Sequence, residues 1–536
     1  MRRASIVLGF GACVAIGATL VGVAAQSDKS RQPAAGQTQS PAPAASLAGR
    51  QYGRLVIRNA MLINGRGTPT EGPMDIVIEK DTIADIIPTD GVSIRSYGAN
   101  WKRPEGDRVI DATGMYVMPG LIDMHTHVPG TRRGGADQSD YAYKLWLAHG
   151  VTTLRDAGAD AGIERMVKDR EMSAANQIIA PRLFLYERWP NVSRQRELGH
   201  TPEEARELVR TFKSRGADGV KVSKGPGHFP DIIEAICDEA RKQGMRGVMV
   251  DLKVSETDAV VAANAGVRSL EHYYGVPDAA IPGSQHFPPD YNYWDEVDRF
   301  RWSGQLWQEA QQHPENLEKV INTMIEKKMN WDPTMVAYEP SRDVMRARRL
   351  EWHDTYVLPS IWSAWIPNAS THGSFHANWR TSDEINWKQH FAIWQKYIKM
   401  FFDRGGVLTV GADSGTAYGL YGFSTIRELE LMQEVGLHPL DIIKIATSNA
   451  AQILGEKRLE GVRIGNLADL AIVDGNPLDN FKVMYGTGVD VFDRDGKPSH
   501  KGGVRWTIKA GIVFDAPALL KDVERQVRQA GSRPTM

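Results

Sequence analysis

The stretch Gly120-Leu-Ile-Asp-Met-His-Thr-His127 is a short, mostly apolar strand pattern that ends in two histidines. Residues two apart in a strand share one face, so His125 and His127 point to the same side. Seven further apolar segments follow, with helical sequence between most of them: 151–156, 182–186, 219–223, 247–252, 268–273, 331–336 and 407–413. This alternation predicts an α/β fold with a parallel sheet, and eight strands form a closed (β/α)8 TIM barrel, here over residues 119–455.

One helix of this barrel is marked at both of its ends. Thr201-Pro-Glu-Glu204 offers an N-cap, a proline at the first helical position and a glutamate in capping-box register. Gly216 is placed to end the helix before the fourth strand. The spacing therefore predicts a helix between these two signals.

Both ends of the chain are rich in β patterns. Met74-Asp-Ile-Val-Ile-Glu79 is typical of the first region, and matching patterns return after the barrel. We expect residues 50–118 and 456–520 to form one small β-sandwich domain. Residues 26–49 have the Ser, Gln, Pro and Ala content of a flexible linker, and 521–536 are expected to be a C-terminal tail.

The barrel sequence contains a tryptophan-rich insertion at about 276–400. Ten of the fourteen tryptophans of the chain fall between Trp294 and Trp394. The insertion could form its own small apolar core, or it could form a lid with aromatic walls over the barrel mouth.

The first 25 residues have the layout of a secretory signal peptide. Arg2 and Arg3 precede an apolar run that ends at Val23-Ala-Ala25, a small-residue cleavage site. An uncleaved anchor is the alternative, because the run is about long enough to span a bilayer. We expect cleavage and an exported protein, periplasmic or secreted, with no stable membrane insertion.

Composition narrows the class of partner. Lys+Arg (64) and Asp+Glu (65) almost cancel, which argues against a nucleic-acid binder or a partner recognised by bulk charge. The partner that we expect is a small-molecule substrate. Cys13 and Cys237 are the two cysteines, so a cleaved chain can form no internal disulfide. Cys237 lies in an amphipathic helix pattern and is expected to be a buried, inert thiol. A homo-oligomer is left open.

The chemistry-bearing residues stand at the ends of the predicted strands. His272 ends the sixth strand and Asp413 the eighth, while His125 and His127 end the first. The ends of barrel strands converge on one axis, as a metal site requires. In the fourth strand Lys221 lies between Val220 and Val222 and would point inward. Its burial could be resolved by an ion pair with a carboxylate or by carbamate formation with CO₂.

Four motifs resemble the amidohydrolase superfamily, with the prolidase and imidazolonepropionase-like hydrolases as the nearest subgroup. They are Val109-Ile-Asp-Ala-Thr-Gly114 before the His-x-His strand, Gly150-Val-Thr-Thr-Leu-Arg-Asp-Ala-Gly158, Ala446-Thr-Ser-Asn-Ala-Ala451 and Gly465-Asn-Leu-Ala-Asp-Leu-Ala-Ile-Val-Asp-Gly-Asn-Pro477. The resemblance covers nearly the whole chain after the linker except the tryptophan-rich insertion.

The resemblance implies a divalent metal, zinc before others, with one or two ions per chain. His125, His127 and Asp413 would hold the first ion, His272 would help to hold a second, and carboxylated Lys221 would bridge them. Asp413, with His272 beside it in the catalytic site, would take a proton from the metal-activated water and pass it to the leaving group.

The chain departs from this pattern at the fifth strand, where related sequences place a histidine. Here the sequence is Val248-Met-Val-Asp-Leu-Lys-Val254, and Asp251 is nearest to the expected position. Asp251 could replace the histidine with an oxygen ligand, or the second metal could be weak or absent.

We therefore expect a metal-dependent hydrolase of carbon–nitrogen bonds, such as a dipeptidase or an N-acyl amino acid hydrolase. Ester or lactone hydrolysis, or an isomerisation, could use the same metal site. A barrel that has lost its metal and serves as a binding protein is the non-enzymatic alternative.

Overall fold

The structure is a computed structural model that describes residues 47–129, 138–190, 199–223, 227–253, 256–283, 295–366, 376, 379–416 and 418–533. The expected signal peptide and nearly all of the expected linker lie outside the described residues. Within the described ranges, no helix combines the length and apolar character needed to cross a bilayer.

Seven parallel strands form most of a barrel, which confirms the predicted fold class. They are, in spatial order, β7 (Leu121–Thr126), β8 (Val151–Gly158), β9 (Arg182–Arg188), β10 (Gly219–Val222), β11 (Val248–Val250), β12 (Ser269–Glu271) and β13 (Asn330–Asp332). The seventh strand is shorter than expected, since β13 ends at Asp332 and helix α10 begins at Met335.

The eighth segment, residues 407–413, closes the barrel without forming a regular strand. The amide of Trp331 in β13 donates to Val407 O, and Leu408 forms an isolated parallel bridge with Trp331. On the other side the amide of Met124 in β7 donates to Val410 O at 2.8 Å. The segment therefore bonds to both edges of the seven-stranded sheet, and Asp413 stands next to the end of β7.

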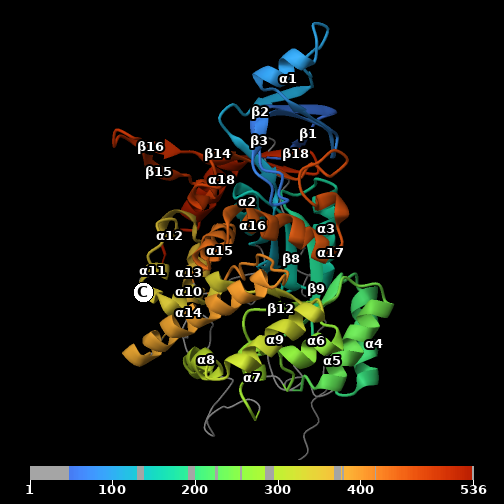
Figure 1. The fold of residues 1–536 in the computed structure, drawn as a ribbon, viewed down its shortest axis with the longest axis vertical. Coiled ribbons are helices and arrows are strands. Elements are labelled where there is room, and N and C mark those ends of the chain that lie inside the picture. Colours follow the sequence, from blue (N-terminus) through green and yellow to red (C-terminus); the bar gives the residue numbers. More distant parts are fainter. Residues whose placement is uncertain are drawn as a thin grey trace, which may run out of the picture. The chain divides into compact units, whose positions relative to one another are not determined.

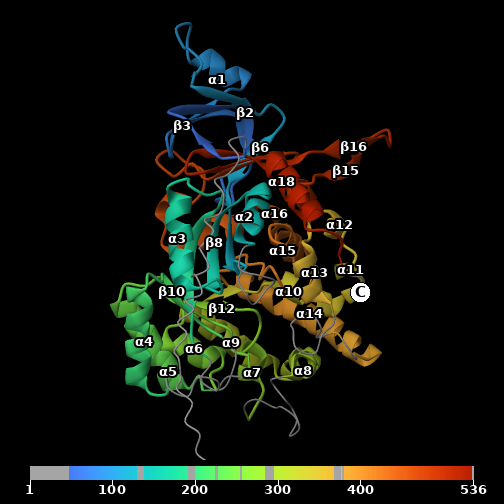
Figure 2. The same cartoon turned by 180° about the vertical axis from the view of Figure 1, so that it is seen from behind.

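Helices surround the barrel and connect its strands (Figures 1 and 2). They are α2 (Ser139–Ala148), α3 (Ile163–Ala174), α4 (Pro202–Ser214), α5 (Pro230–Lys242), α6 (Ala259–Ala265), α7 (Val276–Ala280), α8 (Glu296–Ala310), α9 (Pro314–Glu326), α10 (Met335–Arg342), α11 (Val344–Ala347), α12 (His353–Tyr356), α13 (Pro359–Trp365), α14 (Thr381–Asp403), α15 (Phe423–Glu434), α16 (Pro439–Lys444) and α17 (Ala450–Leu454). The predicted capping box is confirmed, because Thr201 and Glu204 make both of its hydrogen bonds at the start of α4.

Strands from both chain ends form a second, mostly antiparallel sheet, at the top of Figure 1. Its nine strands are β1 (Arg50–Gln51), β2 (Arg54–Leu62), β3 (Glu71–Glu79), β4 (Thr82–Pro88), β5 (Arg108–Asp111), β6 (Tyr116–Pro119), β14 (Leu470–Asp474), β17 (Gly503–Lys509) and β18 (Ile512–Asp515). These strands form one continuous hydrogen-bonded sheet, and β2, β3, β14 and β17 contribute to a shared apolar core, so both chain ends build the second domain as expected. Helix α1 (Gly91–Ser96) and the ribbon of β15 (Val489–Phe492) and β16 (Pro498–Lys501) complete these end regions.

Two segments differ from the sequence-based expectation. The buried tryptophans of the insertion, among them Trp307, Trp387 and Trp394, belong to the same apolar core as the barrel. Trp394 packs on Tyr273 next to β12 at a ring distance of 5.1 Å, so of the two alternatives the separate apolar core is wrong. The expected C-terminal tail is also largely helical, because α18 (Ala516–Gln529) buries Val523 and Val527 and packs on α2.

Candidate metal centre

His125, His127 and Asp413 converge at the carboxyl end of the barrel. One ligand atom from each of these buried side chains lies within 4.8 Å of the other two. The Oδ1 atom of Asp413 is 3.2 Å from His127 Nε2 and 4.0 Å from His125 Nε2. Two imidazole nitrogens and a carboxylate oxygen are ligands that suit zinc and related divalent ions.

Each of the two histidines has a carboxylate near its other ring nitrogen, and for His125 this contact is a hydrogen bond. His125 Nδ1 lies 2.6 Å from Glu271 Oε2, and His127 Nδ1 lies 3.1 Å from Asp160 Oδ2. A carboxylate at Nδ1 fixes the tautomer and directs the Nε2 lone pair toward the ligand position. Burial and the nearby Lys221 lower the pKa of His125 to about 4, which favours the neutral imidazole that a metal binds.

Glu271 belongs to a buried polar network that the sequence analysis did not select. Its Oε1 accepts hydrogen bonds from Arg155 Nη2 at 2.9 Å and from the Ser269 hydroxyl. Burial alone would raise the pKa of Glu271, but Arg155 and His125 hold it below its usual range. A glutamate directly before His272 in an apolar strand was the available signal. The network therefore keeps a negative charge behind His125.

Asp123 links the first strand to the eighth segment. Its Oδ1 accepts from the amide of Ala412 at 3.0 Å, and its Oδ2 accepts from the Thr425 hydroxyl at 2.7 Å. Gly411 is required beside it, because a Cβ at that position would come within 2.5 Å of the His125 Cβ. These contacts position Asp413 against the two histidines.

Lys221 in β10 is buried close enough to Glu271, Asp251 and Asp413 for their charges to act on its pKa. It is 1% exposed, and within the described residues its Nζ has no hydrogen-bond partner. Burial lowers its pKa to about 8, against the opposing effect of Glu271 and Asp251. An amine without a hydrogen-bond partner is costly to bury. The donor set of His125, His127 and Asp413 fits a divalent metal.

His272 lies beside the three convergent groups and is not one of them. Its ring is 4.8 Å from the ring of His125, and its Nδ1 is 2.5 Å from the Thr334 hydroxyl. Burial and Lys253 hold its pKa well below the usual range, so the ring is neutral. His272 and Asp413 both have positive φ angles, 63° and 44°, a backbone strain that clusters at functional sites.

Asp251 occupies the region where related sequences have the strand-five histidine. Its Oδ2 is 3.3 Å from Lys253 Nζ and 3.7 Å from His272 Nε2. Although burial would raise it, the pKa of Asp251 lies below its usual range because the Lys253 ammonium is close. The carboxylate is therefore already engaged by a buried ammonium, which competes with any role as a metal ligand.

The cysteine prediction is confirmed by the structure. Cys237 is buried in α5, and burial raises the pKa of its thiol to about 12. A thiol of that pKa is protonated at neutral pH and is not a nucleophile.

Comparisons with known proteins agree with this geometry. The model of the amidohydrolase family matches residues 116–291 and 398–497, which together cover more than half of the chain, and the chain belongs to this family. The family is metal-dependent, and the His125/His127/Asp413 group is where the structure could hold an ion.

The individual proteins that the chain resembles match it over short segments or at low sequence identity. An adenine deaminase of Listeria innocua is 32% identical over 129 residues, 23% of this chain and 19% of its own length. A 5-methylthioadenosine/S-adenosylhomocysteine deaminase of Desulforudis audaxviator is 38% identical over 99 residues, 18% of this chain and 20% of its own. Matched segments thus span about a fifth of these relatives. A Xaa-Pro dipeptidase structure with bound methionine covers 86% of this chain and 100% of its own, with a TM-score of 0.60 and 19% identity, a likeness of fold.

Proposed function

We propose that the protein hydrolyses a carbon–nitrogen bond of a small molecule, an amide or a dipeptide, and that it uses a divalent metal, zinc before others. The observation that carries the proposal is the convergence of His125 Nε2, His127 Nε2 and Asp413 Oδ1, with a carboxylate close to Nδ1 of each imidazole. The deaminase relatives and the dipeptidase-like fold support the same bond type.

His125, His127 and Asp413 would hold a tightly bound metal, with Lys221 beside them as a carbamate. His272 stands at a second position, which is weak or empty because Asp251 is paired with Lys253. A divalent metal held by His125, His127 and Asp413 would lower the pKa of a water molecule toward about 7 and would polarise the scissile carbonyl.

Asp413 is the acid–base catalyst of the proposed reaction. Its carboxylate accepts a proton from the attacking water and then gives that proton to the leaving nitrogen. General acid–base catalysis of this kind contributes on the order of 10² to 10⁴ in rate. The neutral imidazole of His272 donates from Nδ1 to the Thr334 hydroxyl oxygen, because that hydroxyl gives its own hydrogen to Pro333 O. Its Nε2 therefore keeps a lone pair, which suits a metal ligand or a hydrogen-bond acceptor.

A substrate panel tests the proposed bond type. Metal-loaded enzyme is assayed on dipeptides and N-acyl amino acids, with lactones and carboxylic esters of similar size as the comparison. Turnover of at least one amide or dipeptide, lost in His127→Ala, supports the proposal. Turnover restricted to esters or lactones would replace it with a different hydrolase, and inactivity on every class after metal loading would favour a binding protein.

We also propose that the protein is exported and that the mature chain begins near Gln26. The Arg2-Arg3 start and the Val23-Ala-Ala25 site support this proposal. N-terminal sequencing of the protein from the host cell envelope and medium tests it. A membrane-bound protein that retains residues 1–25 would refute it.

A further inference from the structure

A cavity of about 590 Å³ lies at the amino end of the barrel, away from the metal centre. Its lining includes Arg182, the first residue of β9, and Asp218, just before β10, whereas the metal-site histidines of β7 stand at the strand's other end. The opposite wall comes from the sheet domain, with Ala510 and Ile512 at the turn between β17 and β18. Small-molecule sites commonly have this volume and lie between domains.

The carboxylates of this cavity are already neutralised. Three acids line it, and each faces an arginine. The pairs are Asp81 with Arg458 at 3.7 Å, Asp218 with Arg170 at 2.8 Å and Glu456 with Arg246 at 2.5 Å. Arg182, which also lines the cavity, pairs with Asp469 at 2.5 Å.

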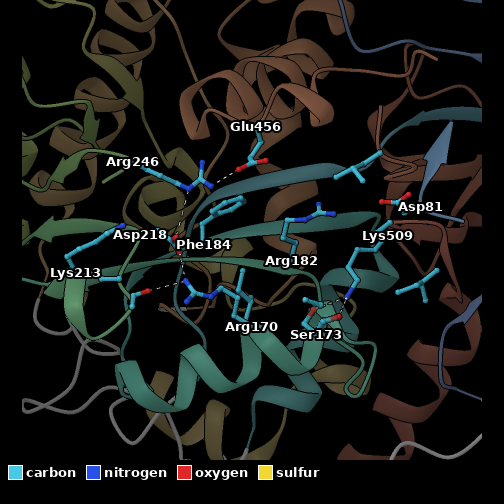
Figure 3. Close-up of a pocket in the computed structure, with 17 residues that line it drawn as sticks. Asp81, Arg170, Ser173, Arg182, Phe184, Lys213, Asp218, Arg246, Glu456 and Lys509 are labelled. Atoms are coloured by element: carbon cyan, nitrogen blue, oxygen red, sulfur yellow. Dashed lines mark hydrogen bonds and ion pairs between the residues drawn. The ribbon is translucent and has the colours of Figure 1, made fainter. Parts of the chain in front are cut away.

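Two lysines in the lining have no such partner. Lys509 is 3% exposed, and its Nζ donates to three neutral oxygens, Ser173 O and Oγ at 2.8 Å and Ala180 O at 2.9 Å. Lys213 is exposed at the end of α4 and makes no ion pair within the described part of the chain. Figure 3 shows the two lysines on opposite sides of the view, with Phe184 and Arg182 between them. The lining therefore has an excess of positive charge.

Part of the wall is apolar. Leu183 and Phe184 of β9 and Leu467 and Ile512 of the sheet domain all line the cavity. Arg246 lies over the Phe184 ring at 4.5 Å, so the ring is held in place by a cation–π contact. A ligand here meets an apolar surface as well as the positive charge.

We propose that this cavity is a second binding site, for a small organic carboxylate with a flat apolar body. The carboxylate group is attracted by the positive charge of the lining, to which Lys509 contributes on one side and Lys213 on the other, and the apolar body contacts Phe184, Leu467 and Ile512. The site takes no part in hydrolysis, and a bound ligand stabilises the folded protein by joining the barrel to the sheet domain.

The pKa of Lys509 predicts that ligand binding to this cavity depends on pH. Burial and the neighbouring Arg182 lower the pKa of Lys509 to about 7, while Asp469 acts in the opposite direction. The ring of Phe514 lies 6.0 Å from the ammonium on the sheet side. A bound anion favours the charged form, so binding at a pH above this pKa takes up a proton, and affinity falls as the pH rises.

Isothermal titration of the metal-loaded full chain with naphthoate tests the proposal, with naphthamide as the neutral analogue. We expect saturable naphthoate binding, about tenfold weaker in Lys509→Met because a buried charge is lost. In Lys213→Met, which removes an exposed charge, we expect about threefold weaker binding. Lys168→Met, an exposed lysine of α3 outside the lining, is the matched control and should bind as the wild type does.

Naphthoate could instead bind at the metal, so His127→Ala is titrated as well. Binding that persists in His127→Ala and weakens in the two lysine variants supports the second site. Absence of saturable binding, equal affinity for naphthamide, or binding lost in His127→Ala and unchanged in Lys213→Met would overturn it. If Lys509→Met does not fold, Lys213→Met and the neutral analogue decide the outcome.

Discussion

The substitution Glu271→Gln removes the negative charge next to His125 and keeps the size of the side chain, so it tests what that charge contributes. The buried guanidinium of Arg155 then loses its nearest counter-charge, which lies 2.9 Å away in the wild type. Breaking a buried ion pair costs about 3–5 kcal/mol of folding free energy. Asp332 lies 3.9 Å from Arg155, and burial and Glu271 raise its pKa. Removal of the Glu271 charge lets Asp332 ionise, so we expect the lower end, about 3 kcal/mol.

The same change should weaken metal binding. Without the carboxylate 2.6 Å from Nδ1, His125 loses the partner that fixes its tautomer and raises its basicity. Loss of such a partner typically lowers metal affinity by about 10- to 100-fold, or about 1.4–2.7 kcal/mol. Urea denaturation of the metal-free protein measures the first effect, and competition with a chelator measures the second.

Glu339→Gln is the matched control. Glu339 is also a buried carboxylate in α10, paired with Arg427 at 2.7 Å, and it does not contact the site histidines. It should lose stability and keep its metal affinity. If Glu271→Gln binds metal within about twofold of the wild type while it loses as much stability as Glu339→Gln, the proposed orientation of His125 is refuted.

Three other predictions concern the ligands and the folded state. His125→Ala or His127→Ala should abolish turnover with an unchanged circular dichroism spectrum, and near-wild-type activity with normal metal content would refute the assignment. Lys221→Ala should lose metal and activity, with partial rescue by formate or acetate; a high-resolution map of unmodified lysine paired to an acid would contradict the carbamate. Burial raises the pKa of Asp522, but hydrogen bonds, among them the one from Lys144, lower it from 3.8 to about 2. The charged Asp522 therefore stabilises the fold above about pH 4, and this stabilisation is lost as the pH falls toward 2. The loss of stability in Asp522→Asn should therefore be larger at pH 7 than at pH 3 in urea denaturation, and equal losses would refute the pairing.

The first strand was predictable because its signal is local. The alternation of side chains along a strand is enough to place His125 and His127 on one face, and the capping box at Thr201 is encoded by four consecutive residues. The end of the barrel was harder to predict. Residues 407–413 are apolar enough for a strand, but they make an isolated bridge and scattered hydrogen bonds, which depend on both neighbouring strands.

The polar network behind the site could not be predicted for a similar reason. Glu271 and Arg155 are 116 residues apart in the chain, and each alone is a charged residue in a buried strand. Their pairing follows from the barrel geometry, which brings β8 and β12 to one axis. The ion pair between Asp251 and Lys253 likewise depends on where the fold places the two side chains, which the sequence alone does not show.

The central claim is that one metal is held tightly by His125, His127 and Asp413. Metal per chain is measured after dialysis against a mild chelator, for the wild type, His127→Ala and Asp251→Ala. The account predicts about one ion in the wild type, about one in Asp251→Ala and almost none in His127→Ala. Metal retained by His127→Ala would contradict the assignment of the site. About two ions in the wild type, falling to about one in Asp251→Ala, would show instead that Asp251 takes the place of the strand-five histidine.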